Sequence, residues 1–278
     1  MTLLTVDETL CKKDGICAAE CPMGIIKWKK GELPVPVPKA PELCIDCGHC
    51  VAVCPHGALS HEKLAPEDCL TLNKNLILSP EQTEHFIRAR RSIRTFKETP
   101  VDKDTLSEII RLASFAPSGH NCQPVHWRVL SGREIVKAHT AMVIDWMKEF
   151  LKENPKMAKA LHMDMLVVSW KLGMDTLTRN APTLILAQGK ENNPMAPAAC
   201  TIAMTYLDLV AQSFDVGTCW CGYFLRAAST YAPLAEKLGK DQGLKTYGVM
   251  MTGYPKYKYH RMPTRNTPNI TWTEGPAS

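Results

Sequence analysis

The spacing of apolar residues predicts two helices early in a large C-terminal region. The first begins with Ser79 as a cap and Pro80 at the first helical position, and it runs to Arg90. The second begins near Asp102 and ends before Pro117. Its apolar residues recur at helical spacing: Leu106, Ile109, Ile110 and Ala113.

Alternating and continuous apolar runs predict strands further along the chain. VHWRVL alternates, which puts Val125, Trp127 and Val129 on one face of a strand. PTLILAQ, from Pro182, is typical of a buried strand, and GVMMTGYP is typical of a last strand before a polar, proline-rich tail.

Three longer segments between these strands have a helical pattern. Residues 134–152 and 156–173 are separated by Asn154-Pro155, and residues 196–214 form a long helix whose only charge is Asp208. A helix that is apolar nearly all round must be buried, either in a core or against another subunit. Helices and strands thus mix without regular alternation, which indicates an α+β domain. No G-x-G-x-x-G follows a strand, so no dinucleotide-binding fold is expected.

The N-terminal region has a different pattern and predicts a separate small domain. Residues 1–62 contain two cysteine runs, separated by GELPVPVPKAPE, whose prolines favour an extended connector between two hairpin-like halves. Residues 63–80 are expected to be a linker, and residues 81–278 the second domain. A unit of about 60 residues has little apolar core, so bound metal is expected to hold it folded.

Composition narrows the class of protein. The chain has 278 residues, 45% of them hydrophobic, and a formal net charge of +5. No stripe of lysine and arginine appears, so we expect no nucleic-acid partner. The N-terminus lacks the pattern of a signal peptide, and no apolar run reaches membrane-spanning length. Twelve cysteines then indicate a reducing cytoplasm.

The cysteine spacing predicts two iron–sulfur clusters. CIDCGHCVAVCP has the C-x2-C-x2-C-x3-C-P run of bacterial ferredoxins, whose fourth cysteine ligates the other cluster. A second run, CKKDGICAAECP, lies upstream, with Asp14 in place of its second cysteine. The crossed arrangement gives one cluster to Cys44, Cys47, Cys50 and Cys21. It gives the other to Cys11, Cys17, Cys54 and Asp14.

Other interpretations of these cysteines are weaker, but the role of Asp14 is open. A zinc ribbon needs neither the third cysteine nor the Cys-Pro pair, and a disulfide framework does not suit a chain without a secretion signal. A carboxylate is a harder and weaker ligand for iron than a thiolate. The second cluster is therefore either an Asp14-ligated 4Fe-4S cluster or a 3Fe-4S cluster, unless Asp14 is an ordinary turn residue.

Four segments of the second domain combine residues suited to binding a cofactor. RRSIRTF surrounds Ser92 with arginines whose planar guanidinium groups suit a phosphate, although a solvated basic turn has the same pattern. APSGHNCQP is a glycine-bearing loop between a helix and a strand. Its small residues, Pro117 and Ser118 among them, let backbone amides approach a planar ligand. Asn121 and Gln123 add side-chain amides that suit the polar edge of a flavin.

The other two segments lie nearer the C-terminus. VGTCWCGYF carries Cys219 and Cys221, whose C-x-C spacing differs from the C-x2-C of thioredoxin-like sites, so we expect them to line a cofactor pocket. GYPKYKYHR supplies cations after a strand; its lysines are equally compatible with solubility, and Arg261 could reach a phosphate.

In their order and spacing, RRSIRTF, APSGHNCQP and GYP resemble the FMN-dependent nitroreductase family over roughly residues 80–265. Residues 1–62 resemble a two-cluster bacterial ferredoxin. The resemblance implies a nitroreductase-type α+β fold, which forms a homodimer with FMN at the subunit interface. The chain departs from the family in reading Gln-Pro-Val-His-Trp where many relatives have Gln-Pro-Trp, and in Cys221, where some have Glu or Gly.

The resemblance also assigns roles to residues. Arg90, Ser92 and Arg94 would contact the phosphate and ribityl chain of FMN, and Asn121 would contact the isoalloxazine edge. Cys221 and Gly222 would approach the reactive N5 atom, and Arg261 would bind phosphate. No catalytic acid is identified.

These expectations define an iron–sulfur flavoenzyme that passes electrons from its clusters to FMN and on to a small organic acceptor, such as a nitroaromatic or a quinone. The donor would be a soluble low-potential carrier or NAD(P)H. Reductive dehalogenation, alkene reduction and a non-catalytic electron-transfer or redox-sensing role are the alternatives. Residues 140–180, rich in methionine and tryptophan, are either a substrate lid or ordinary helix packing.

Overall fold

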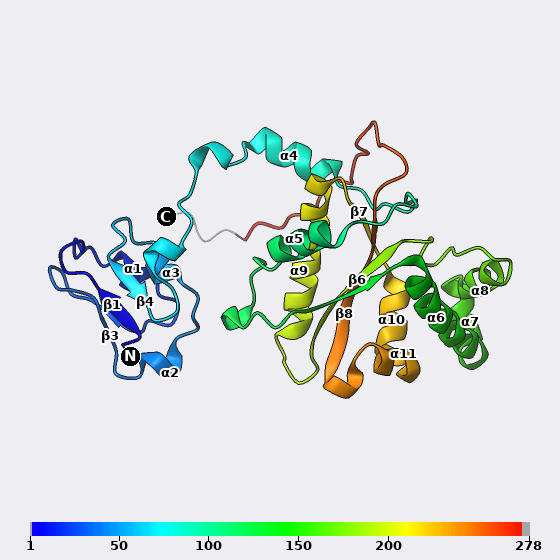
Figure 1. Cartoon of the computed structure of the whole chain (residues 1–278), viewed down its shortest axis with the longest axis horizontal. Coiled ribbons are helices and arrows are strands. Elements are labelled where there is room, and N and C mark those ends of the chain that lie inside the picture. Colours follow the sequence, from blue (N-terminus) through cyan, green and yellow to red (C-terminus); the bar gives the residue numbers. More distant parts are fainter. Residues whose placement is uncertain (1, 274–278) are drawn as a thin grey trace.

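A computed structural model describes residues 2–273 of the chain. A small N-terminal domain, blue and cyan in Figure 1, is joined to a larger α+β domain by a segment that carries helix α4. The loop between α5 and β5 of the larger domain reaches back toward the small one. No helix within residues 2–273 combines the length and the apolar character that crossing a bilayer requires.

The small domain consists of two two-stranded antiparallel sheets and three short helices. Strand β1 (Leu4–Val6) pairs with β4 (Leu59–His61), so the two ends of the domain are held together. Strand β2 (Ile26–Lys27) pairs with β3 (Val35–Pro36). The helices are α1 (Ile16–Glu20), α2 (Ala40–Leu43) and α3 (His49–Ala52).

The proline-rich connector between the cysteine runs is expected to be extended, and the structure is extended in its middle but helical at its end. Its middle closes the hairpin with β2, and its end forms the helical turn α2, which begins with Ala40 and Pro41. Proline suits both places, since it is compatible with an edge strand and with the first turn of a helix.

The larger domain is built on a four-stranded antiparallel sheet with the order β5-β6-β8-β7. The strands are β5 (His126–Ser131), β6 (Thr183–Lys190), β7 (Gly217–Trp220) and β8 (Leu244–Gly253). The three predicted strands are confirmed. Strand β7 was missed because its glycines and cysteines suggested a turn-rich pocket wall.

Both faces of this sheet are covered, and the middle of its inner strand β6, residues 184–187, is apolar. Leu184 and Leu186 of β6 point into one core, and Ile185 and Ala187 point into the other. The first core is completed by α6 (Arg133–Glu153), α8 (Met163–Lys171), α10 (Gly222–Thr230) and α11 (Ala232–Lys237). The second is completed by α5 (Lys103–Ala113) and α9 (Ala196–Ala211), on the opposite side in Figure 1. Strand β5 lies at the edge of the sheet, where Val129, expected to share a face with Trp127, is exposed.

Most predicted helix limits are confirmed within a few residues. Ser79 caps α4 (Pro80–Ala89) by accepting a hydrogen bond from the Gln82 N–H, and Asp102 caps α5 in the same way. The segment expected as one helix over 156–173 is two, α7 (Pro155–Ala160) and α8, because His162 takes a left-handed φ of 52° between them. Helices α10 and α11 were not predicted.

Helix α9 is buried on one side only. Its residues Met204 and Leu207 lie in the core, whereas Ile202 and Tyr206 on the other side are exposed. The sequence predicted that this helix is buried in a core or against another subunit. The core covers one face, and the outer apolar face is left for a neighbouring molecule.

Candidate functional site

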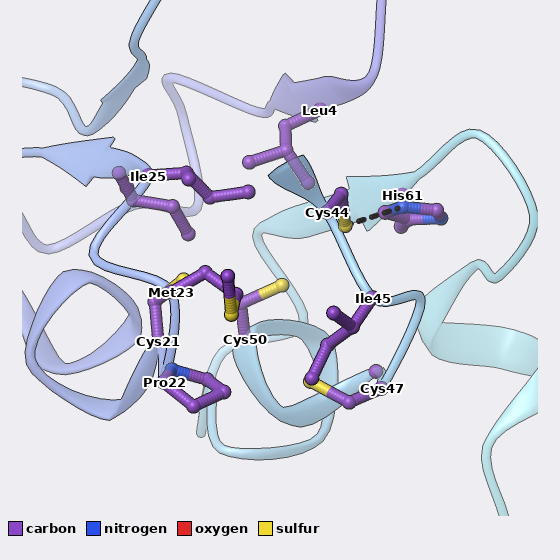
Figure 2. A pocket seen from close by; sticks show the side chains of 12 residues that line it. Leu4, Cys21, Pro22, Met23, Ile25, Cys44, Ile45, Cys47, Cys50 and His61 are labelled. Carbon is purple, nitrogen blue, oxygen red and sulfur yellow. Dashed lines mark hydrogen bonds between the residues drawn. The ribbon is translucent and has the colours of Figure 1, made fainter. Parts of the chain in front are cut away.

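A cavity in the small domain gathers four cysteines from both cysteine runs. Cys44, Cys47 and Cys50 line it together with Cys21 from the upstream run, and Figure 2 shows their side chains around the same space. The crossed arrangement predicted from the spacing therefore describes where the thiols lie. We call this cavity cage 1.

A second cavity, cage 2, gathers the remaining cysteines of the two runs. Cys11 and Cys17 line it together with Cys54, and Asp14 lies on its wall. Asp14 is exposed, and its Oδ1 accepts a hydrogen bond from the Ile16 N–H at 3.1 Å. Both roles considered for Asp14, a cage residue and a turn residue, are thus compatible with its position.

Each cage is shaped by a glycine before a short helix. Gly15 precedes α1 with φ 76°, and Gly48 precedes α3 with φ 70°. A β-carbon on Gly15 would lie 2.4 Å from the Trp28 ring, so glycine is required there for space as well as conformation. These turns place Cys17 on α1 and Cys50 on α3 at the cage walls.

Without a bound cation, burial and mutual repulsion keep the cage thiols protonated. Burial is the largest cause that raises the pKa of the Cys50 thiol, to about 11, with a further contribution from neighbouring Cys47. Burial likewise raises the pKa of Cys17 and Cys44. Thiols packed this way ionise when positive metal enters, and four sulfur donors around one space are the donor set of an iron–sulfur cluster.

His61 is a residue of cage 1 that the sequence did not indicate. Its Nδ1 lies 3.1 Å from the Lys63 backbone N–H, which can only donate, so the ring proton is on Nε2. That Nε2 lies 3.5 Å from Cys44 Sγ and 3.3 Å from Asp46 Oδ1. The ring is buried beside Cys44 (Figure 2), and its Nε2–H faces both the Cys44 sulfur and the Asp46 carboxylate.

The larger domain contains a cavity of about 680 Å³ beside the RRSIRTF segment. Four cationic side chains line it: Arg90, Arg91, Lys97 and Lys258. Of these, only Arg90 was predicted as a cofactor-binding residue. Lys258 belongs to GYPKYKYHR, where Arg261 was the expected residue; Arg261, the last residue of that segment, is exposed and does not line the cavity.

Two of these arginines differ in how they are held. Arg90 Nη1 lies 3.4 Å from Asp208 Oδ2, and Asp208 also accepts a hydrogen bond from Thr218. Burial raises the pKa of Asp208, an effect that Thr218 and Arg90 oppose. Arg91 has a buried Nε with no partner among the described residues, and its guanidinium lies 5.8 Å from the Tyr259 ring centre. A buried unpaired donor among cations fits an anionic group such as phosphate.

The segment is attached to the sheet by its backbone. Ser92 bridges Thr218 of β7, and the Ile93 N–H donates to the Thr218 carbonyl at 2.9 Å. A β-carbon on Gly217 would lie 2.5 Å from Ile93, so this strand can approach only as glycine. The close approach of Ile93 therefore explains why the first glycine of VGTCWCGYF, Gly217, is a glycine.

Arg94 points to a different, neighbouring cavity of about 570 Å³. Lys97 lines this cavity as well as the larger one, and Glu98 and Asp175 provide opposite charge. Three further cations on its wall are Arg133, Arg179 and Lys256. Arg133 and Arg179 were not predicted, because each comes from a different part of the chain, whereas Lys256 belongs to GYPKYKYHR, which was predicted to supply cations.

The predicted flavin loop, residues 116–124, is oriented toward the small domain. Asn121 Nδ2 donates to the Ile45 carbonyl at 3.2 Å and to the Asp46 carbonyl at 3.0 Å. Ser118 accepts a hydrogen bond from the Gln123 N–H, and Pro117 is exposed. The structure thus gives Asn121 partners other than the isoalloxazine edge to which the resemblance assigned it.

Cys219 and Cys221 are packed in the core below the sheet. Both thiols are buried, and burial raises the pKa of Cys221 to about 12. Cys221 in that state is a poor nucleophile. The expectation that Cys219 and Cys221 line a cofactor pocket stays a prediction. Their side chains face the core, while Gly217 and Thr218 line the 680 Å³ cavity. Gly222 begins α10.

The proposed lid over residues 140–180 divides into core and surface. Trp146, Met147 and Met163 are buried in the first core, so they pack helices α6 and α8. Met165 and Met174 are exposed, at 63% and 50%. Of these residues, only the exposed Met165 and Met174 are available to a substrate lid.

Two family models match the chain. The nitroreductase family model matches residues 87–254, and the model of the 4Fe-4S dicluster domain matches residues 9–59. The first match covers more than half of the chain, so the protein belongs to the nitroreductase family and carries an N-terminal 4Fe-4S dicluster domain. It is an FMN-dependent oxidoreductase of that family. The domain limits at residues 62 and 80 stay predictions.

Named relatives match each part of the chain. An Archaeoglobus fulgidus protein, provisionally named NADH dehydrogenase/NAD(P)H nitroreductase, is 25% identical over 63% of this chain and 87% of its own length. "Ferredoxin 7Fe" of Hydrogenibacillus schlegelii is 34% identical over 24% of this chain and 82% of its own length. The "4-nitrobenzoate reductase" of Nocardioides sp. is 38% identical over 25% of this chain and 28% of its own length.

Solved structures match the larger domain. A nitroreductase with bound FMN from Bacteroides fragilis has a TM-score of 0.57 at 22% identity, covering 69% of this chain and 99% of that one. Another with bound FMN, from Desulfitobacterium hafniense, has a TM-score of 0.55 at 22% identity, covering 71% and 100%. These likenesses establish the fold.

Proposed function

We propose that this protein passes electrons from two iron–sulfur clusters to FMN and on to a small organic acceptor, of which a nitroaromatic compound is the first candidate. The observation that carries the proposal is cage 1, where Cys21 from one run joins Cys44, Cys47 and Cys50 from the other. Such a cage has the donors of a one-electron centre, and it belongs to the same chain as a nitroreductase domain.

The cages would hold the clusters through the eight residues predicted from the sequence. Cage 1 offers four thiolates and suits a 4Fe-4S cluster. Cage 2 offers three thiolates and the Asp14 carboxylate. The name of the ferredoxin relative, 7Fe, favours a 3Fe-4S cluster in cage 2 beside a 4Fe-4S cluster in cage 1.

The larger domain would hold FMN between the segment 90–97 and strand β7. Arg91, with its unpaired Nε, and Lys97 and Lys258 would neutralise the phosphate, while Asp208 keeps Arg90 oriented at the cavity wall. When bound, FMN accepts electrons singly and passes them on in pairs. The backbone of Cys221 and Gly222 and the side chain of Ser92 remain proposed contacts of the cofactor, as does Arg261.

The cavity around Arg94 favours an acceptor that carries negative charge. Arg94, Arg133, Arg179 and Lys256 outnumber Glu98 and Asp175 on its wall. A nitroaromatic carboxylate matches that charge, and two relatives, from Nocardioides and Pseudomonas putida, are named 4-nitrobenzoate reductase.

We further propose that the protein works as a homodimer. The outer face of α9 exposes Ile202 at 37% and Tyr206 at 39%, and a second copy of the chain would cover these side chains. A soluble low-potential carrier or NAD(P)H would supply the electrons.

The test is anaerobic reoxidation of the reduced holoprotein. Protein purified anaerobically with its clusters and FMN is photoreduced and then mixed with 4-nitrobenzoate, a quinone, a haloaromatic compound or an activated alkene, and the flavin absorbance is followed. We expect the nitroaromatic compound and the quinone to reoxidise the flavin fastest. Fastest reoxidation by the haloaromatic or the alkene would support the alternative reductases. A flavin that none of the four reoxidises would indicate an electron carrier.

A matched pair of cysteine variants tests the clusters. Cys47→Ser removes a cage 1 thiol, whereas Cys69→Ser changes a thiol that lines neither cage. Reduction of the flavin by dithionite through the clusters should slow in Cys47→Ser and stay unchanged in Cys69→Ser. Equal rates in both variants would remove the clusters from the electron path.

A further inference from the structure

The segment that joins the two domains is apolar, whereas a linker that only spans a gap is usually polar. Five large aliphatic side chains lie within residues 70–78, each exposed by between 53% and 98%: Leu70, Leu72, Leu76, Ile77 and Leu78. The two family models match residues 9–59 and 87–254, so the fold of neither domain accounts for these side chains. Exposed aliphatic residues at this density indicate a surface that is covered in the working protein.

We call residues 66–89 the arm, and capping residues give it a defined shape. Asn73 accepts a hydrogen bond from the Asn75 N–H at the start of a 3₁₀ turn, Lys74–Leu76, and Ser79 caps α4. No residue of this turn or of α4 is buried. A helix of ten residues is marginal in water and normally depends on tertiary packing. The arm therefore has local structure that lacks a packing surface.

The arm is held by its own chain near each end. At the start, Cys69 packs against the core of the small domain. At the other end, the Phe86 carbonyl accepts a hydrogen bond from Gln212 Nε2 at 3.2 Å. Between these points the arm arches away from both domains (Figure 1). Its aliphatic side chains are thus left uncovered by the chain to which they belong.

The exposed area of the arm matches the size of a dimer contact. A leucine-sized side chain removes roughly 100 Å² of apolar surface from water when it is buried, so the five aliphatic residues and the 50% exposed Ile87 together offer roughly 400 Å². In a two-fold dimer each arm covers an equal area on the other copy, which buries roughly 1,600 Å² in total. This is the size of a standard, stable protein interface.

The charges of the arm favour a second copy of the chain over a lipid surface. Carboxylates outnumber cations among its charged residues, which are Glu67, Asp68, Glu81, Glu84, Lys74 and Arg88. The whole chain has a net charge of +5, so the arm is acidic and the rest of the chain is basic. Opposite charge attracts the arm to a second copy, whereas an anionic lipid surface would repel it.

The arm also starts from the helix that carries the proposed dimer face. Gln212, which holds Phe86, directly follows α9, and the outer side of α9 exposes Ile202 and Tyr206. Helix α9 thus connects the attachment point of the arm with another uncovered apolar surface. Two copies related by a two-fold axis can cover both surfaces at once, because each arm then faces α9 of the other copy.

We propose that the arm of each copy lies on the outer face of α9 of the second copy, so that exchanged arms hold the dimer together. This rests on the homodimer of the proposed function and names the segment that makes the contact. The apolar side chains of the arm and those of α9 then remove one another from water.

The first experiment measures dimer dissociation by sedimentation velocity, with the full chain carrying its clusters and FMN. An arm variant combines Leu70→Gln, Leu72→Gln and Ile77→Gln. The matched control combines three exposed apolar residues on and beside α6 and α8, which cover the opposite face of the sheet from α9: Ile135→Gln, Val168→Gln and Leu172→Gln. Circular dichroism and the contents of iron and FMN establish that each variant is folded.

The second experiment locates the arm without weakening the contact. Leu72 is replaced by the photoreactive residue p-benzoylphenylalanine, and Leu172 is replaced in the same way as the control. After irradiation, a denaturing gel separates chains joined to each other from chains joined only within themselves. Mass spectrometry of the joined peptides identifies the residues that the arm contacts.

We expect the dimer dissociation constant to rise by roughly 100-fold in the arm variant, because each arm loses three apolar contacts, and to stay near the wild-type value in the control. Irradiation at position 72 should give joined chains linked to peptides from residues 196–212, and irradiation at position 172 should not. An unchanged dissociation constant in the arm variant, equal losses in both variants, or links only within one chain would overturn the exchanged arms.

These outcomes are distinct from failure of the proposed function. A dimeric arm variant would overturn the exchanged arms and leave the dimer itself in place. A monomeric wild-type protein would overturn both the arms and the dimer. The path of the electrons is tested separately by flavin reoxidation, which neither of these two measurements uses.

Discussion

The Nε2 of His61 lies 3.5 Å from the Sγ of Cys44 and 3.3 Å from the Oδ1 of Asp46, and it carries the ring proton because Nδ1 already accepts from the Lys63 N–H. Hydrogen bonds to cluster sulfurs raise the reduction potential, since they stabilise the more negative reduced state. The same ring contacts Asp46, whose carbonyl accepts a hydrogen bond from Asn121. His61 thus lies where the potential of the cage 1 cluster can be adjusted.

Replacing His61 tests this directly. His61→Leu should lower the potential of the cage 1 cluster by on the order of 50 mV, because about 1.4 kcal/mol corresponds to 59 mV for one electron. An EPR-monitored redox titration measures the shift. His61→Gln keeps an N–H donor and should shift less; equal shifts in both variants would contradict a role of the hydrogen bond.

The Asp14 position tests the nature of the second cluster. Asp14→Cys supplies a fourth thiolate to cage 2, so iron content should rise by about one atom per chain and the EPR signal of an oxidised 3Fe-4S cluster should disappear. Asp7→Cys, an exposed aspartate outside both cages, is the control. An unchanged EPR spectrum and iron content in Asp14→Cys would remove Asp14 from the proposed ligands.

Arg91 tests the phosphate end of the proposed FMN site. Arg91→Ala should weaken FMN binding by roughly 10- to 100-fold, because hydrogen bonds to charged groups contribute about 1.5–3 kcal/mol. Riboflavin, which lacks the phosphate, should lose much less affinity, and fluorescence titration measures both. Arg88→Ala, on the exposed side of α4 and paired with Glu84, should bind FMN as the wild type does. Equal losses for FMN and riboflavin would contradict phosphate binding by Arg91.

The buried carboxyl group of Asp208 should make the free energy of unfolding depend on pH. Burial raises its pKa above the usual value of 3.8, so the native state holds this proton more tightly than the unfolded chain. The contribution of this carboxyl group to the free energy of unfolding is fully present below its pKa in the unfolded chain. That contribution is lost as pH rises through the native pKa, because the buried group must then ionise.

Urea unfolding of the larger domain, followed by circular dichroism from below the unfolded pKa of 3.8 up to neutral pH, measures this effect. Asp208→Asn should remove the part of the decline that comes from this carboxyl group. Asp215→Asn, an exposed aspartate of the same cavity, should retain the decline. The same slope in wild type and Asp208→Asn would exclude the titration of Asp208 as its cause.

The sequence by itself determined the local features. The caps Ser79 and Asp102 predicted two helix starts because capping depends on neighbouring residues alone. The continuous apolar run after Pro182 predicted the central strand β6, since a strand covered on both faces has no polar side. The cysteine spacing likewise predicted which thiols share a cage, because a short chain segment limits where each sulfur can lie.

Only the tertiary structure decided which distant residues meet. Arg90 pairs with Asp208, and Asn121 donates to the Ile45 carbonyl. Arg94 lines the same cavity as Arg133 and Arg179. These residues are far apart in the sequence, and no local pattern specifies that they meet. His61 was missed for the same reason, since its placement beside Cys44 is a tertiary contact, and the pairing of β7 with β8 likewise outweighs the turn-like glycines and cysteines of that strand. Motif residues specify the chemistry that a site can perform, whereas packing decides which of them share it.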